Sequence, residues 1–143
     1  MINLGVTSMS FRKFYFLFFC LISATALLTA CSTVDNNNRD TRELATYMIN
    51  ATGGVWDGPW EVRPLHAVEG FALRIGDRQV VFVKYDNTKK KMKKKLDYVD
   101  EHGYLYIAAF RIPAIRHGSF VMLDYEGFPE KIRKNLLDSF KAF

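Results

Sequence analysis

The sequence predicts an α+β domain in which a small, mainly antiparallel sheet is covered by flanking helices. Three observations support this fold class: apolar residues recur at helical spacing in some segments, they alternate with a period of two in others, and glycine-containing turns separate the segments. The expected order of elements is α, β, β, α, β, β, α, with four strands in the sheet. Residues 40 to 143, about 104 residues, suffice for one modest core but not for two.

The first helix is predicted over residues 41 to 51. Asp40 followed by Glu43 is typical of a capping box, which satisfies free backbone N–H groups at a helix start. Apolar residues then recur at helical spacing: Leu44, Tyr47, Met48 and Ala51. Gly53 follows Thr52 and ends the helix, because glycine readily adopts the left-handed conformation that a helix C-terminus needs.

A β-hairpin is predicted from Phe71 to Tyr85. Gly76-Asp77 supplies its turn. Apolar residues alternate along both strands: Phe71, Leu73 and Ile75 before the turn, and Val81, Val83 and Tyr85 after it.

Two more strands and a helix are predicted in the C-terminal part. Tyr104 to Phe110 is an almost unbroken apolar run, which predicts a central strand covered on both faces. Phe120 to Tyr125 is the second strand. The last helix begins at Gly127-Phe128-Pro129, since proline is tolerated in a first helical turn. Its apolar residues form one stripe that must cover the sheet: Ile132, Leu136, Leu137, Phe140 and Phe143.

Residues 89 to 102 fit two structures. A series at helical spacing, with Gly103 after it as a stop, favours a helix: Met92, Leu96 and Val99. Met92, Leu96 and Tyr98 also fit a strand that leads into an Asp-Glu-His-Gly turn. We expect the helix and keep the strand as the alternative.

The first thirty residues have the layout of a secretory signal rather than of a folded element. Arg12 and Lys13 precede an uncharged apolar run from Phe14 to Leu28, and small residues follow. The run is about 15 residues long, short of the roughly 20 needed to span a bilayer, which disfavours a retained transmembrane helix. Translation from Met9 instead of Met1 would give a signal of more ordinary length.

The segment ends in Leu28-Thr29-Ala30-Cys31, which resembles the lipobox of bacterial lipoproteins. The resemblance is confined to the targeting segment. It implies that a peptidase cuts after Ala30 and that Cys31 carries a diacylglyceryl group on sulfur, usually with an acyl group on the new amino terminus. Two or three chains anchor durably, since each buried methylene contributes about 0.8 kcal/mol. The residue after Cys31 is Ser32 rather than Asp, which resembles the default of Gram-negative lipoproteins that are sorted to the outer membrane. The domain would then face the periplasm. In a Gram-positive organism the inference of an outer-membrane location does not apply.

The resemblance divides the chain into a signal peptide (1 to 30), a lipidated cysteine with a flexible tether (31 to 39) and a folded domain (40 to 143). The tether is polar and has no apolar periodicity. Cleavage removes Cys20, which leaves Cys31 alone and no intramolecular disulfide.

No catalytic or metal-ligating pattern is visible in the mature sequence. His66, His102 and His117 are widely separated and match no zinc-protease spacing. Ser119 lacks the surroundings of a nucleophile elbow. Carboxylates suffice for a glycoside-cleaving enzyme, but no pair is marked by apolar neighbours. We therefore expect a non-catalytic protein with no cofactor and no metal.

The most unusual feature is a run of six lysines in seven positions: Lys89, Lys90, Lys91, Lys93, Lys94 and Lys95. Because like charges repel on a helix, one interpretation is contact with an anionic surface, namely lipid headgroups, acidic glycan or a partner's carboxylates. The other is a solvated face that Asp97, Asp100 and Glu101 partly compensate. Without Arg12 and Lys13, 18 basic and 15 acidic side chains remain, a net charge of +3. Nucleic acid is not an expected partner in this compartment.

Two smaller clusters are also binding candidates. Trp56 and Trp60 bracket an Asp-Gly-Pro turn, where exposed indoles would stack on sugars or anchor a protein interface. More often such tryptophans fold back over the core. Arg111 and Arg116, with His117, are candidates for a basic loop after the central strand, but ordinary solubility is the favoured explanation of their charge.

We expect a membrane-anchored lipoprotein with a non-catalytic role, which supports an envelope assembly by binding a protein partner. One alternative is a ligand-binding or inhibitor module that captures a glycan, a lipid or a foreign enzyme through Trp56, Trp60 and the lysine segment. The second alternative is an enzyme that acts on peptidoglycan.

Overall fold

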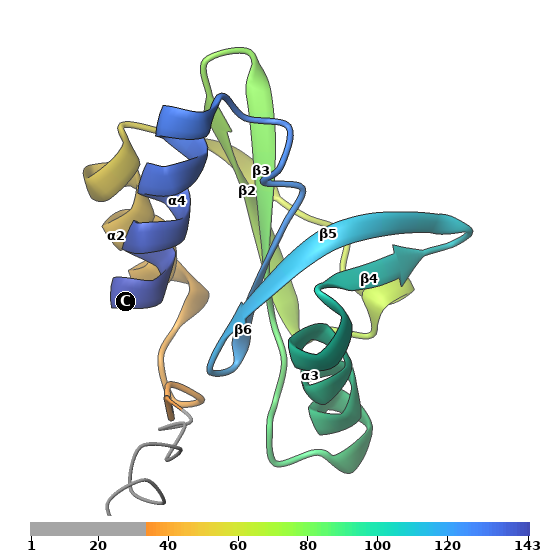
Figure 1. The fold of residues 1–143 in the computed structure, drawn as a ribbon. Coiled ribbons are helices and arrows are strands. Elements are labelled where there is room, and N and C mark those ends of the chain that lie inside the picture. The colour runs from red at the N-terminus through yellow and green to blue at the C-terminus, as the bar shows by residue number, and fades with distance from the viewer. Residues whose placement is uncertain (1–33) are drawn as a thin grey trace, which may run out of the picture. The chain divides into compact units, whose positions relative to one another are not determined.

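The structure, a computed structural model, describes residues 34 to 143; the expected signal peptide and Cys31 lie outside these residues. The described chain forms helices and strands in the following order, labelled as in Figure 1: α2 (Thr41–Thr52), β1 (Val55–Pro59), the 3-10 helix η2 (Arg63–Leu65), β2 (Glu69–Ile75), β3 (Arg78–Lys84), α3 (Lys90–His102), β4 (Tyr104–Ile107), β5 (Phe110–His117), β6 (Phe120–Leu123) and α4 (Glu130–Ala142). The predicted α+β class is confirmed.

The strands form one antiparallel sheet in the order β1-β2-β3-β6-β5-β4 (Figure 1). β3 and β6 are therefore central, and β1 and β4 are the edges. The prediction of four strands is wrong, because β1 and β5 lie in segments where the sequence predicted a turn and a loop. Both segments contain glycine or proline, yet both pair with a neighbouring strand.

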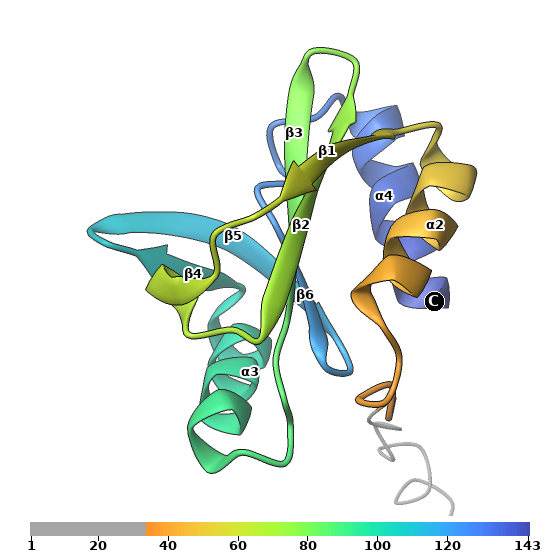
Figure 2. The same cartoon turned by 180° about the vertical axis from the view of Figure 1, so that it is seen from behind.

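Helices cover both faces of the sheet (Figures 1 and 2). α2 and α4 pack on one face, where the first core includes Phe71, Phe82, Phe120, Leu136 and Phe140. α3 and η2 pack on the other face, where the second core includes Leu65, Val83, Leu96, Val121 and Leu123. All four residues of β6 are buried, because alternate side chains of a strand enter opposite cores.

The three predicted helices are confirmed, and Asp40, Gly53 and Gly103 mark helix ends as expected. The Asp40 carboxylate accepts a hydrogen bond from the Arg42 N–H at 2.9 Å and caps α2. Glu43 pairs with Arg39 instead of completing a capping box. Residues 90 to 102 form the helix α3, so the strand alternative is wrong, and Gly103 ends it with a φ of 73°.

The predicted hairpin is confirmed as β2 and β3. Ile75 pairs with Arg78 across the two-residue turn, and Gly76 has a φ of 65°, which glycine adopts without strain. The last helix is confirmed as α4, and it buries Leu136 and Phe140 as its apolar stripe required.

The segment from Tyr104 to Phe110 is not a central strand. β4 ends at Ile107, Ala108 takes a positive φ of 54°, and β5 begins at Phe110. Only Leu105 of β4 is buried. The apolar run arises because tyrosines alternate with aliphatic residues along an edge strand that has one covered face.

The folded domain begins before Asp40. Asn36 is only 3% exposed. Its side-chain Nδ2 donates to the His117 carbonyl at 3.2 Å, and its Oδ1 accepts from the Ser119 N–H at 2.7 Å. Part of the segment expected to be a flexible tether is therefore packed on the turn between β5 and β6. The sequence pattern did not reveal this packing, because the buried residue is a polar asparagine and produces no apolar periodicity.

Replacing Phe82 with Ala is expected to lower the free energy of unfolding by about 3 to 5 kcal/mol, because the buried ring lies between Phe71 and Phe140 in the first core. Phe110→Ala removes the same side chain from an exposed position and should change stability by less than about 0.5 kcal/mol. Urea denaturation of both variants measures the difference. An equal loss of unfolding free energy in both variants would contradict the burial of Phe82 of β3 in the first core.

Candidate functional site

β4 and the first half of β5 form a two-stranded ribbon, residues 104 to 113, which we call the arm. Leu105 pairs with Ile112, and Ile107 pairs with Phe110. β6 pairs only with the second half of β5, from Ala114 onward. The arm therefore extends past β6 and projects to one side of the domain (Figure 1). Among the described strands, β4 has a neighbour on one side only.

The arm exposes aromatic side chains on both faces, since directly paired residues of antiparallel strands share a face. On one face Leu105 is buried in the second core, but exposure rises to 72% at Phe110 near the tip. On the other face Tyr106 is 52% exposed. Beside it, the Arg111 guanidinium lies 3.8 Å from the centre of the Tyr104 ring. Exposed aromatic residues with arginine are typical of protein interfaces.

The tyrosine face of the arm continues onto the end of α3. The His102 ring stacks on Tyr98 with 4.1 Å between ring centres. Tyr104 contacts Tyr98 at 5.6 Å and Tyr106 at 5.4 Å, both edge to face. The sequence pattern did not predict this aromatic series. The alternation of tyrosine with aliphatic residues in Tyr104-Leu105-Tyr106-Ile107 was the signal that could have found it.

Arg111 and Arg116 do not form a basic loop, because both lie in β5. Arg111 is exposed on the arm. Arg116 faces α3, where its Nη1 lies 2.6 Å from an Asp100 oxygen and 3.5 Å from an Asp97 oxygen. His117 faces the other core, where its ring contacts Phe140. Arg116 and His117 are neighbours in sequence, but side chains alternate along a strand, so the two point to opposite faces of the sheet.

Trp56 and Trp60 do not form one surface. Trp56 lies in β1, whose register shifts between Trp56 and Gly58, so the Asp-Gly-Pro segment is an irregular strand rather than a turn. The Trp56 ring is half-exposed and stacks on Phe71 of the first core at 5.5 Å. Trp60 packs against the second core. The two indoles therefore serve opposite faces of the sheet.

The lysine segment forms the start of α3. Lys89 is the N-cap residue, has no side-chain capping bond, and lies 3.6 Å from an Asp86 oxygen. The other five lysines form no ion pair within residues 34 to 143. Lys95 is half-buried, and burial lowers the pKa of its amine. The remaining four are exposed.

The acidic residues that could compensate the lysines have other partners. Asp97 and Asp100 pair with Arg116, and Glu101 lies near His102. These three acidic residues lie in the second half of α3, whereas the lysines lie in the first half. The lysines are therefore at the positive end of the helix dipole and the carboxylates at the negative end. This order opposes helix stability. Helix stability therefore does not explain the lysines.

A cavity of about 600 Å³ adjoins the start of α3. It is lined by His66, Lys89, Lys90, Lys91, Met92 and Lys95. Almost all of its lining is carbon, which indicates that the aliphatic stems of the lysines form the walls.

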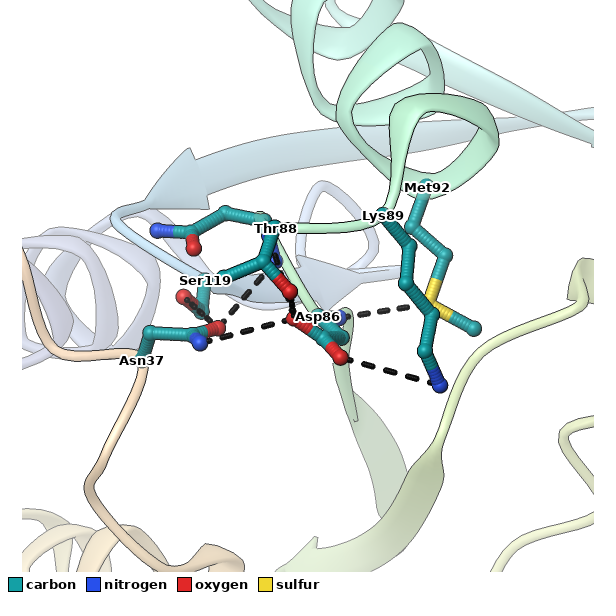
Figure 3. A network of polar contacts seen from close by, with 7 residues as sticks. Asn37, Asp86, Thr88, Lys89, Met92 and Ser119 are labelled. Atoms are coloured by element: carbon teal, nitrogen blue, oxygen red, sulfur yellow. Dashed lines mark hydrogen bonds and ion pairs between the residues drawn. The ribbon is translucent and has the colours of Figure 1, made fainter.

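A polar junction fixes the first described residues to the loop before α3 (Figure 3). Asn37 Oδ1 accepts from the Ser119 hydroxyl at 2.9 Å and from the Asn87 N–H at 3.1 Å. Its Nδ2 donates to Asp86 at 3.5 Å. Bonds from the Thr88 hydroxyl and N–H, with the one from Asn37, hold the pKa of Asp86 below its ordinary value and keep it ionised.

Ser119 is fully buried and donates its hydroxyl to Asn37, which makes it a structural residue of this junction. Within the described residues, no group of three or more histidine, cysteine, aspartate or glutamate side chains is placed to hold a metal ion. No helix in residues 34 to 143 is long and apolar enough to cross a membrane. No protein-family model, curated protein or solved structure matches the chain.

Asn36→Ala is expected to lower the free energy of unfolding by about 1 to 3 kcal/mol, because the Ser119 N–H and the His117 carbonyl lose their partner. Urea denaturation measures the loss, and faster hydrogen exchange of the Ser119 amide locates it. Asn38→Ala is the matched control, since Asn38 is exposed and nearby. If the two variants were equally stable, residues 34 to 39 would not be part of the folded domain.

Proposed function

We propose that this protein is a membrane-anchored lipoprotein, lipidated on Cys31, with a non-catalytic role in which the arm binds a protein partner and so supports an envelope assembly. Outer-membrane attachment, with the domain in the periplasm, follows from the lipobox resemblance and Ser32. The observation that carries the binding role is the projecting arm with its exposed Phe110, Tyr106 and Arg111.

The arm supports protein binding in two ways. The outer backbone of β4 has no strand beside it in the described chain, so an extended segment of a partner could add to the sheet there. Phe110 and Tyr106 offer large, stiff side chains that lose little entropy when buried, which suits them as interface anchors.

The ligand-binding alternative through paired indoles receives no support, because Trp56 and Trp60 pack against opposite cores. A sugar ring would meet only one of them. The lysine segment remains available for a ligand.

Cys31→Ser is expected to abolish lipid attachment and leave an uncleaved precursor, because the modified sulfur is lost. Metabolic labelling with a radioactive fatty acid, followed by electrophoresis, measures both effects. Cys20→Ser is the matched control, since it removes the chain's other cysteine from the apolar run and should keep full labelling. Normal labelling of Cys31→Ser would refute the anchor.

A photoreactive amino acid at position 110 is expected to cross-link one reproducible envelope protein in intact cells, because Phe110 is the most exposed large apolar residue of the described chain. The same probe at Val68, which is also exposed but lies outside the arm, is the control. A strand added beside β4 would contact both faces of the arm, so Tyr106→Ala, on the face opposite Phe110, should weaken the cross-link from position 110 by roughly tenfold. Identical products from positions 110 and 68, or none from 110, would exclude the arm as the binding surface.

A further inference from the structure

We infer that the first half of α3 is a membrane-contact surface, at which its lysines bind the headgroups of anionic phospholipids in the bilayer that holds the anchor. The inference rests on the lipid anchor proposed above but is independent of the arm. Three observations support it: where the chain enters the domain, which charges lack partners, and what lines the neighbouring cavity.

The chain enters the domain beside the lysines. Asn37 is bonded to Asp86 and Asn87 in the loop before α3. Figures 1 and 2 place the first described residues and the start of α3 at the same end of the domain. Cys31 precedes Asn37 by six residues, and six residues span at most about 20 Å. A lipid on Cys31 therefore keeps the bilayer close to the start of α3.

The charge of this end of the domain favours an anionic surface. Lys90, Lys91 and Lys94 are exposed and have no carboxylate partner within residues 34 to 143. Lipid phosphates at the surface of the bilayer would supply the missing counter-charge, and basic side chains gain from them only within about a Debye length. The covalent link, which spans at most about 20 Å, lets the lysines come within that distance of the headgroups.

The cavity beside α3 matches the chemistry of a phospholipid near its headgroup. Its walls are His66, Met92 and the carbon stems of the lysines, while the ammonium groups belong to the same lysine side chains. A glycerol backbone with its first methylenes fits carbon walls, and the attached phosphate fits the ammonium groups. Lys95 is half-buried beside this cavity, and a bound phosphate would offset the desolvation of its amine.

An acidic segment of a protein is the competing source of negative charge. An acidic segment could bind the lysines at any position on the domain surface. Binding to such a segment therefore does not explain why the lysines lie beside the point where the chain enters the domain. A bilayer does give that reason, because the anchor fixes which end of the domain meets it.

The first test measures headgroup affinity without the anchor. The mature chain with Cys31→Ser, which keeps every described residue, is sedimented at low salt with vesicles of phosphatidylcholine alone or with about 30 mol% phosphatidylglycerol. Binding is expected only to the anionic vesicles. Changing Lys90, Lys91 and Lys94 to Gln should weaken binding roughly tenfold or more.

The matched control changes Lys131, Lys134 and Lys141 to Gln. These lysines are also exposed on a helix, α4, and the charge change is identical. This variant should bind almost as well as the unchanged chain. Equal losses in both variants, or no loss in either, would overturn the assignment of the surface to α3.

The second test uses the lipidated protein in the same two kinds of vesicle. Mass spectrometry after brief amine acetylation is expected to show the α3 lysines protected in anionic vesicles, and exposed again in high salt, with the α4 lysines reactive throughout. If lipid is present on Cys31 but the α3 lysines react equally in both vesicles, the membrane-contact surface is wrong and the anchor stands. If no lipid is found on Cys31, the anchor fails, and the first test alone decides whether α3 binds these headgroups.

Discussion

Burial of the central strands on both faces is the constraint on which the rest of the structure depends. Alternation along β3 sends Phe82 into the first core and Val83 into the second, and β6 repeats this pattern. A sheet that is apolar on both faces needs helices on both. α3 therefore lies against the second core through Leu96 and Val99, and this contact leaves its lysines on the sides that face outward.

A glycine decides where the chain enters this framework. Gly118 has a φ of 61°, and a Cβ there would collide with the Asn36 carboxamide and the Val34 carbonyl. Only glycine lets the first described residues lie this close to the turn between β5 and β6. Asn36 and Asn37 then form bonds with residues far away in sequence, which fixes the entry of the chain beside α3.

The helices could be predicted from the sequence because their signals are local: Asp40 and Gly103 mark helix ends, and Leu96 and Val99 recur at helical spacing. The sheet could be predicted only in part, because strand order depends on pairing between distant segments. Tyr104 to Ile107 therefore resembled a central strand although it is an edge. The lysines were recognised as a run in the sequence, whereas the arm was not predicted, since exposed tyrosines count as apolar in a sequence pattern.

The two proposed surfaces are joined by one helix. The lysines occupy the start of α3, and at its end Tyr98 and His102 contact Tyr104 of the arm. α3 has 13 residues, so it spans about 20 Å along its axis. With its start at the bilayer and its axis perpendicular to the membrane, the helix would set the base of the arm at about that distance from the headgroups. Because Arg116 ties the second half of α3 to β5 through Asp97 and Asp100, helix and arm would move as one body, and the membrane contact would orient the partner-binding surface.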